Sequence, residues 1–143
     1  MILPDVNVLV HAHHAKSEEH AAYRAWWESV VNSDASFGIA DLLLSGFAWV
    51  VTHPKVFATP LTAHQAFAAA DAIRSRPNCV VVRPGDRHWE IFATLCRKTR
   101  ARGNHIPDAY LAALAIESGS EFLTADRGFA RYPGLRWRHP LDD

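Results

Sequence analysis

The sequence predicts an α/β fold, in which helices cover both faces of a central, mostly parallel sheet. Short apolar runs typical of strands alternate along the chain with longer stretches whose apolar residues recur at helical spacing. Strands that alternate with helices in this way form parallel sheets. The chain has 143 residues, of which 49% are hydrophobic and 21% charged, so it can bury one sizeable core.

Five segments have the length and composition of strands. They cover residues 2–5, 36–41, 79–86 with its turn, 121–126 and 135–140. The segments between them predict helices over 6–14, 17–31, 42–52, from 62 onward and 87–101, and a loop followed by a helix within 103–119. The expected sheet therefore has four to five strands.

Local signals mark several helix ends. Ser17 is a candidate N-cap, and Thr62 with Gln65 makes a capping box that opens a helix. Pro107 fits the first helical turn, where no backbone N–H is needed, and Gly119 is a C-terminal stop.

The two halves of the chain differ in charge, although the formal net charge is zero. Residues 1–71 hold three Lys and Arg against seven Asp and Glu, a net of −4, and residues 72–143 hold twelve against eight, a net of +4. A basic half is typical of nucleic-acid binding, and a solvated helix face is the alternative. The candidate RNA-binding cations are Arg97, Lys98, Arg100, Arg102 and Arg127.

The composition also limits the cellular setting. Cys79 and Cys96 have no metal-site spacing and no disulfide framework, so we expect buried thiols in a reducing compartment. No apolar run approaches the roughly 18 residues of a membrane span. No basic residues precede the first apolar run, which argues against a signal peptide. We expect a cytoplasmic protein.

Aspartates end most of the expected strands. Asp5, Asp41, Asp86 and Asp126 each close a strand or its turn, and Asp108 begins a helix. In a parallel sheet these ends share one edge, where open α/β folds bind their ligands. Any single aspartate here is explained as a helix cap. The set of them repels itself unless a cation intervenes, and carboxylate oxygens suit Mg²⁺ or Mn²⁺.

Three stretches, in this order and at this separation, resemble one known family. They are "LPDVNVLV", "IPDAYLAALAIESG" and "FLTADRGFARYPGLRW". The chain resembles the PIN-domain ribonucleases and, more narrowly, the VapC toxins of type II toxin–antitoxin pairs. The resemblance covers nearly all of residues 1–143 and implies a single three-layer α/β/α PIN domain. It also implies RNA cleavage with Mg²⁺ or Mn²⁺, a cognate VapB-type antitoxin, a homodimer and a toxin–antitoxin hetero-oligomer.

The resemblance assigns roles to individual residues. Asp5, Asp108 and Asp126 match the family's metal-binding acids, and Asn7 and Thr124 match its supporting polar positions. On this basis the three aspartates are the candidate catalytic and metal-binding residues.

One position departs from the family pattern. The family usually has a glutamate in the helix after the second strand, where this chain has Ser45. Asp41 lies one helical turn earlier and is a candidate replacement, because residues four apart share a helix face. The alternative is that Asp41 only caps this helix.

Two other functions compete with metal-assisted hydrolysis. A phosphoacceptor receiver domain also gathers aspartates at strand ends, but it needs an acid pair after the first strand, where this chain has Pro4. The second is a catalytically weakened PIN-like module that binds antitoxin or RNA without cutting, which the serine at position 45 favours.

Overall fold

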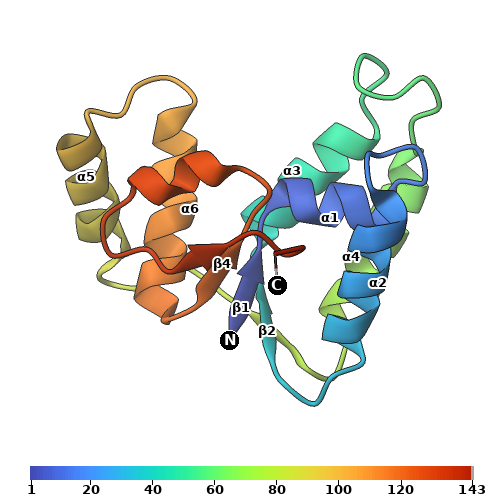
Figure 1. Cartoon of the computed structure of the whole chain (residues 1–143), viewed down its shortest axis with the longest axis horizontal. Helices are drawn as coiled ribbons and strands as arrows, with labels where there is room; N and C mark the ends of the chain where they lie inside the picture. The colour runs from blue at the N-terminus through green and yellow to red at the C-terminus, as the bar shows by residue number, and fades with distance from the viewer. Residues whose placement is uncertain (143) are drawn as a thin grey trace.

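Five parallel strands form the centre of the computed structural model, which describes residues 1–142 (Figure 1). The strands are β1 (Ile2–Pro4), β2 (Phe37–Ile39), β3 (Cys79–Val81), β4 (Glu121–Leu123) and β5 (Trp137–Arg138). Their order across the sheet is β3-β2-β1-β4-β5, and every neighbouring pair is parallel. The predicted α/β class and a sheet of five strands are confirmed.

Helices cover both faces of this sheet, which makes three layers. They are α1 (Val6–His13), α2 (His20–Val31), α3 (Asp41–Val51), α4 (Ala63–Arg74), α5 (His88–Thr99), α6 (His105–Ser118) and the short 3₁₀ helix η1 (Arg127–Arg131). Figure 1 shows α5 and α6 on one side of the strands and α1 to α4 on the other. The three-layer α/β/α architecture is therefore confirmed.

Each face of the sheet has its own hydrophobic core, because strand side chains alternate between faces. Phe37 and Ile39 of β2 belong to the core under α1, α2, α3 and α4. Leu3 of β1 and Phe122 of β4 belong to the core under α5 and α6. The alanine-rich α6 is buried in its middle, from Ala109 to Ala115, since small side chains let it fit closely between α5 and the sheet.

The pairing of β1 with β4 places the site. Pro4 lies opposite Leu123, and the backbone N–H of Asp5 donates to Leu123 O at 2.8 Å. The residues that follow the two strands, Asp5 and Thr124, therefore leave the sheet side by side at its carboxyl edge.

Three local expectations are settled by the helix ends. Thr62 and Gln65 form the expected capping box, and Gly119 ends α6 with a positive φ of 68°. Ser17 is not a helix cap, because α2 begins only at His20; its hydroxyl contacts His11 Nδ1 at 2.5 Å instead.

Within residues 1–142, no helix has the length and apolar character needed to cross a membrane.

Candidate active site

Asp5 is a buried carboxylate at the start of α1. Only 6% of the residue is exposed, and it is the N-cap of the helix, where its Oδ1 accepts from the Val6 N–H at 2.7 Å. Its other oxygen, Oδ2, accepts from the Thr124 hydroxyl at 2.7 Å. A carboxylate is tolerated here because both oxygens have donors and the helix N-terminus carries partial positive charge.

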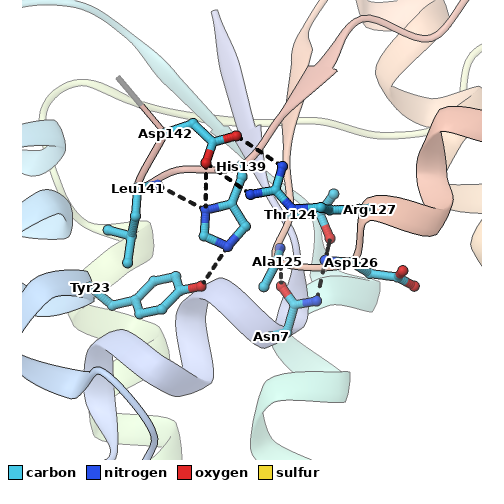
Figure 2. A network of polar contacts seen from close by, with 9 residues as sticks. All are labelled: Asn7, Tyr23, Thr124, Ala125, Asp126, Arg127, His139, Leu141 and Asp142. Carbon is cyan, nitrogen blue, oxygen red and sulfur yellow. Dashed lines mark hydrogen bonds and ion pairs between the residues drawn. The ribbon is translucent and has the colours of Figure 1, made fainter.

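The Thr124 hydroxyl joins four residues of the site. It donates to Asp5 and accepts from Asn7 Nδ2 at 3.3 Å and from the Asp126 N–H at 3.0 Å. Asn7 is fixed from its other end, because its Oδ1 accepts from the Ala125 N–H at 3.2 Å. Figure 2 shows Asn7 reaching Thr124 and Ala125 from α1. The structure thus places Asn7 and Thr124 as supports for Asp5 and Asp126.

Asp126 and Asp108 come from two further segments. Asp126 precedes η1, its Oδ1 accepts from the Gly128 N–H at 2.8 Å, and the residue is exposed. Asp108 lies in the first turn of α6 and is partly buried. Pro107 fits the first turn of α6, directly before Asp108, because the missing backbone N–H is not needed there.

All three aspartates line one hollow of about 560 Å³, which we call the acidic pocket. The remaining lining side chains come from α1 and the turn after it, from α3 and the loop beyond it, and from η1. They are Val6, Asn7, Val10, His11, Lys16, Ser17, Glu18, Val50, Val56, Phe57 and Phe129. The sequence prediction that Asp5, Asp108 and Asp126 meet at one edge of the sheet therefore agrees with the structure.

The carboxylates of the acidic pocket perturb one another. Burial raises the pKa of Asp5 from its ordinary 3.8 to about 6; the charges of Asp108 and Asp126 add to this rise, and the hydrogen bonds from Thr124 and Val6 oppose it. Burial and the charge of Asp126 also raise the pKa of Asp108. This mutual repulsion is the condition that a bound cation relieves.

Carboxylate oxygens, such as those of the acidic pocket, are the ligands that hard divalent cations prefer, but here they do not form a complete coordination sphere. Among residues 1–142, no three His, Cys, Asp or Glu side chains come close enough together to hold a metal ion. Mg²⁺ keeps several waters and is usually held by only one or two carboxylates. One or two of the carboxylates of Asp5, Asp108 and Asp126 could hold such a cation, with water completing its coordination.

Asp41 and Ser45 do not line the acidic pocket. Both line a separate hollow between α3 and α4, and Asp41 Oδ1 lies 3.6 Å from Arg74 Nη2. Asp41 is the first residue of α3 and its side chain is 66% exposed. Asp86, the other strand-end acid, is exposed and also lies outside the pocket lining.

The predicted RNA-binding cations come from two parts of the chain. Arg97, Lys98, Arg100 and Arg102 are exposed at the end of α5 and in the turn after it. Arg127 is already paired, since its guanidinium donates to both carboxylate oxygens of Asp142 at 2.9 and 3.0 Å (Figure 2).

The sequence interpretation missed two contributions to this region. His11 lies four residues after Asn7 on the same helix face, a spacing that signals its presence in the pocket. Its ring stacks on Tyr23 with centroids 4.7 Å apart, and Tyr23 in turn contacts His139 Nε2 at 3.2 Å. Asp142 contacts both His139 and Arg127, so the chain from 139 to 142 joins α2 to η1 (Figure 2). Nothing local in the sequence signals this second contribution.

Comparisons with known proteins place the whole chain among related sequences. The PIN domain family model matches residues 2–135. VapC ribonuclease Mb2897 of Mycobacterium bovis and ribonuclease VapC43 of Mycobacterium tuberculosis are each 49% identical over 142 residues, which span 99% of this chain and 97% of theirs. Ribonuclease VapC25 of M. tuberculosis is 34% identical over 140 residues, with 98% and 99% coverage.

Solved structures share the fold at low sequence identity. VapBC2 from Rickettsia felis, bound to a DNA fragment from its promoter, gives a TM-score of 0.69 at 18% identity, covering 97% of this chain and 98% of that one. VapC20 of M. tuberculosis, described as a toxin that cleaves the sarcin–ricin loop, gives 0.66 at 18% identity, with 95% and 99% coverage.

Proposed function

The chain belongs to the PIN-domain family and, within it, to the VapC ribonucleases, and we propose that it hydrolyses RNA phosphodiester bonds with Mg²⁺ or Mn²⁺ as the toxin of a toxin–antitoxin pair. The observation that carries this proposal is the acidic pocket. Three carboxylates from three separate segments line it, and the most buried of them has a raised pKa. Perturbed carboxyls gathered in a hollow are typical of catalytic sites.

In this proposal Asp5, Asp108 and Asp126 hold the cation. When bound, it polarises a phosphoryl oxygen and lowers the pKa of an attacking water. The chain's own residues then fix the carboxylates: Thr124 and the Val6 N–H orient Asp5, and the Gly128 N–H orients Asp126. A carboxylate of the pocket that is not bound to the cation is placed to accept a proton from water.

The exposed cations Arg97, Lys98, Arg100 and Arg102 are proposed to guide the RNA backbone. Such interactions give affinity that falls with salt and depends little on base sequence. Arg127 joins them only where RNA competes with Asp142, because that carboxylate already occupies its guanidinium.

A VapB-type antitoxin is the proposed partner, within a homodimer and a toxin–antitoxin hetero-oligomer in the cytoplasm. The relative from R. felis is a VapBC2 structure, and the 49% identical relatives are named VapC ribonucleases. A pocket that cuts cellular RNA needs to be blocked, and an arginine from a partner would neutralise its carboxylates.

A weakened module that binds antitoxin or RNA without cutting is the second candidate. Two observations favour it: Asp41 and Ser45 lie outside the acidic pocket, and the described residues contain no ready three-ligand metal group. Calorimetry with Mn²⁺ separates the candidates, since a degenerate site binds no metal at micromolar to millimolar concentration.

The experiment that tests the proposal maps new RNA ends in total RNA after induction of the chain. Wild type should produce defined ends that are absent with Asp108→Ala and present with Asp86→Ala, which removes an exposed acid outside the pocket. Equal ends from wild type and Asp108→Ala would contradict the proposal.

A further inference from the structure

A second hollow, which we call the basic pocket, lies between the end of α5, the start of α6 and the end of η1. Its volume is about 490 Å³, and its lining residues are Lys98, Thr99, His105, Arg131 and Pro133. Three of the five side chains carry nitrogen donors, and none is an acid. Of these residues, only Lys98 is among the candidate RNA-binding cations predicted from the sequence.

The basic pocket borders the acidic pocket. Burial and the charge of Asp126 raise the pKa of Asp108, and the neighbouring His105 and Arg131 oppose this rise, so both lie close enough to act on a carboxylate that lines the acidic pocket. A Cβ added at Gly128 would lie 2.7 Å from Arg131 Nη2 and 2.8 Å from Asp126 Oδ1. The guanidinium of Arg131, which lines the basic pocket, and the carboxylate of Asp126, which lines the acidic pocket, thus lie beside the same glycine.

The wall of the basic pocket is fixed by a buried tyrosine. Tyr132 is 2% exposed, and its hydroxyl donates to His105 O at 3.0 Å, which ties η1 to the start of α6. The Arg131 guanidinium carbon lies 5.9 Å from the centre of the Tyr132 ring. A cation within about 6 Å of a ring centroid is attracted by the ring, which helps to hold the Arg131 guanidinium at the wall of the pocket.

The cations of this pocket have no acidic partner within residues 1–142. No carboxylate there comes within 4.0 Å of Lys98 or Arg131, in contrast to Arg127, Arg138, Arg24 and Arg74. Unpaired donors that converge on a hollow favour an anionic ligand.

We propose that the basic pocket binds a phosphate of the RNA next to the one that is cut, with Arg131 and Lys98 as its ligands and His105 as an additional donor. This inference rests on the proposed function, because an RNA strand held at the acidic pocket carries further phosphates past its edge. It makes Arg131 a determinant of RNA placement, in addition to Arg97, Lys98, Arg100 and Arg102.

The test measures binding of a short single-stranded RNA in the absence of divalent metal, at a series of salt concentrations. Two positive charges are removed in Lys98→Gln/Arg131→Gln and, as the matched control, in Arg83→Gln/Arg87→Gln, which alters two exposed arginines outside the pocket. Each phosphate that is no longer neutralised lowers the slope of log K against log salt by about 0.7, and the basic pocket is proposed to hold one phosphate, so the slope of the first variant should fall by about 0.7 and that of the control by much less. Arg131→Lys should bind RNA more weakly while keeping most of the slope of log K against log salt, because lysine retains the positive charge but cannot donate two parallel hydrogen bonds to one phosphate.

Three outcomes would overturn the inference. They are equal slopes for wild type and the Lys98/Arg131 variant, equal reductions in both double variants, and an Arg131→Lys variant that binds RNA as tightly as wild type. Thermal unfolding of each variant checks that it folds. Cleavage by wild type in Mg²⁺ is measured in parallel, so a wild type that binds RNA with the expected slope but does not cut it contradicts the proposed function alone.

Discussion

The strand ends of this sheet fall into two pairs that have the same sequence signal and different surroundings. Asp5 and Asp126 follow the neighbouring strands β1 and β4 and line the acidic pocket. Asp41 and Asp86 follow β2 and β3 and lie outside its lining. Proximity to β1 does not explain the difference, because β2 is also its neighbour.

For Asp41, the position at which the helix begins explains the difference from Asp5. Asp5 is an N-cap, so its side chain turns back over the helix end and stays in the pocket. Asp41 is already the first helical residue, with Ala40 before it, so its side chain points outward to Arg74 on α4. A shift of one residue in the helix start thus decides whether a strand-end carboxylate joins the site.

The largest expected effect tests the first pair against the second. Asp126→Asn removes a charge that holds the proposed cation, and we expect the rate of RNA cleavage in Mg²⁺ to fall at least about a hundredfold. Asp86→Asn, an equivalent change at an exposed strand end, should stay within about twofold. The cleavage rate of one RNA substrate is measured with each purified protein. Similar rates for the two variants would contradict a functional difference between the two pairs of aspartates.

The next effect concerns the hydroxyl that links β1 to β4. Thr124→Val removes the donor to Asp5 and the acceptor of Asn7, so it should cost about 1–3 kcal/mol in the free energy of unfolding. Metal affinity should fall roughly 10- to 100-fold, as it does when other supporting groups around a metal are removed. Thr52→Val is the control, because that hydroxyl bonds only within its own helix. Unfolding in denaturant measures the free energy of unfolding, and calorimetry with Mn²⁺ measures the metal affinity. Equal values for the two variants would contradict a supporting role for Thr124.

The third effect is a pH dependence of stability from Asp5. Its folded pKa of about 6 lies above its ordinary 3.8, so the folded state binds more protons between these values and stability falls as pH rises through that window. The stability of Asp5→Asn relative to wild type should therefore increase from pH 4 to 6 by up to about 3 kcal/mol and then level off. Denaturant unfolding at each pH measures it. A constant difference across this window, or one that falls with pH, contradicts the raised pKa.

The smallest effect is expected at Asp41. Asp41→Asn removes an exposed ion pair with Arg74, which contributes about 0–1 kcal/mol to stability. RNA cleavage should be unchanged within about twofold. A tenfold drop in the cleavage rate with unchanged stability would contradict this expectation and would indicate that Asp41 acts at the site in place of the family's usual glutamate.

The sequence predicts the class of the fold and most element positions because these depend on local spacing and on caps. The alternation of strands and helices, the capping box at Thr62 and the stop at Gly119 are all local signals. The expected start of α2 was wrong because Ser17 bonds to His11 on another element, and η1 was missed because its short 3₁₀ turn has no apolar period.

The candidate site could be predicted where a motif carries the residue, as for Asp5, Asp108 and Asp126. The interactions that decide the other residues depend on packed elements: Arg127 meets Asp142, Asp41 meets Arg74, and Arg131 lies beside Asp126 across Gly128. Side-chain direction at these positions follows from that packing, which spacing alone does not determine.

The Thr124 hydroxyl makes one donated and two accepted hydrogen bonds, which uses its whole capacity. Rotation about its C–O bond would break the hydrogen bond to Asp5 and leave two donors competing for one place, so the rotor has a single orientation. The conformational entropy of this group is therefore given up when the chain folds, before any ligand arrives. Under the proposed function, a cation or substrate would meet an Asp5 carboxylate whose orientation is already fixed, and its binding would not have to oppose that entropy a second time.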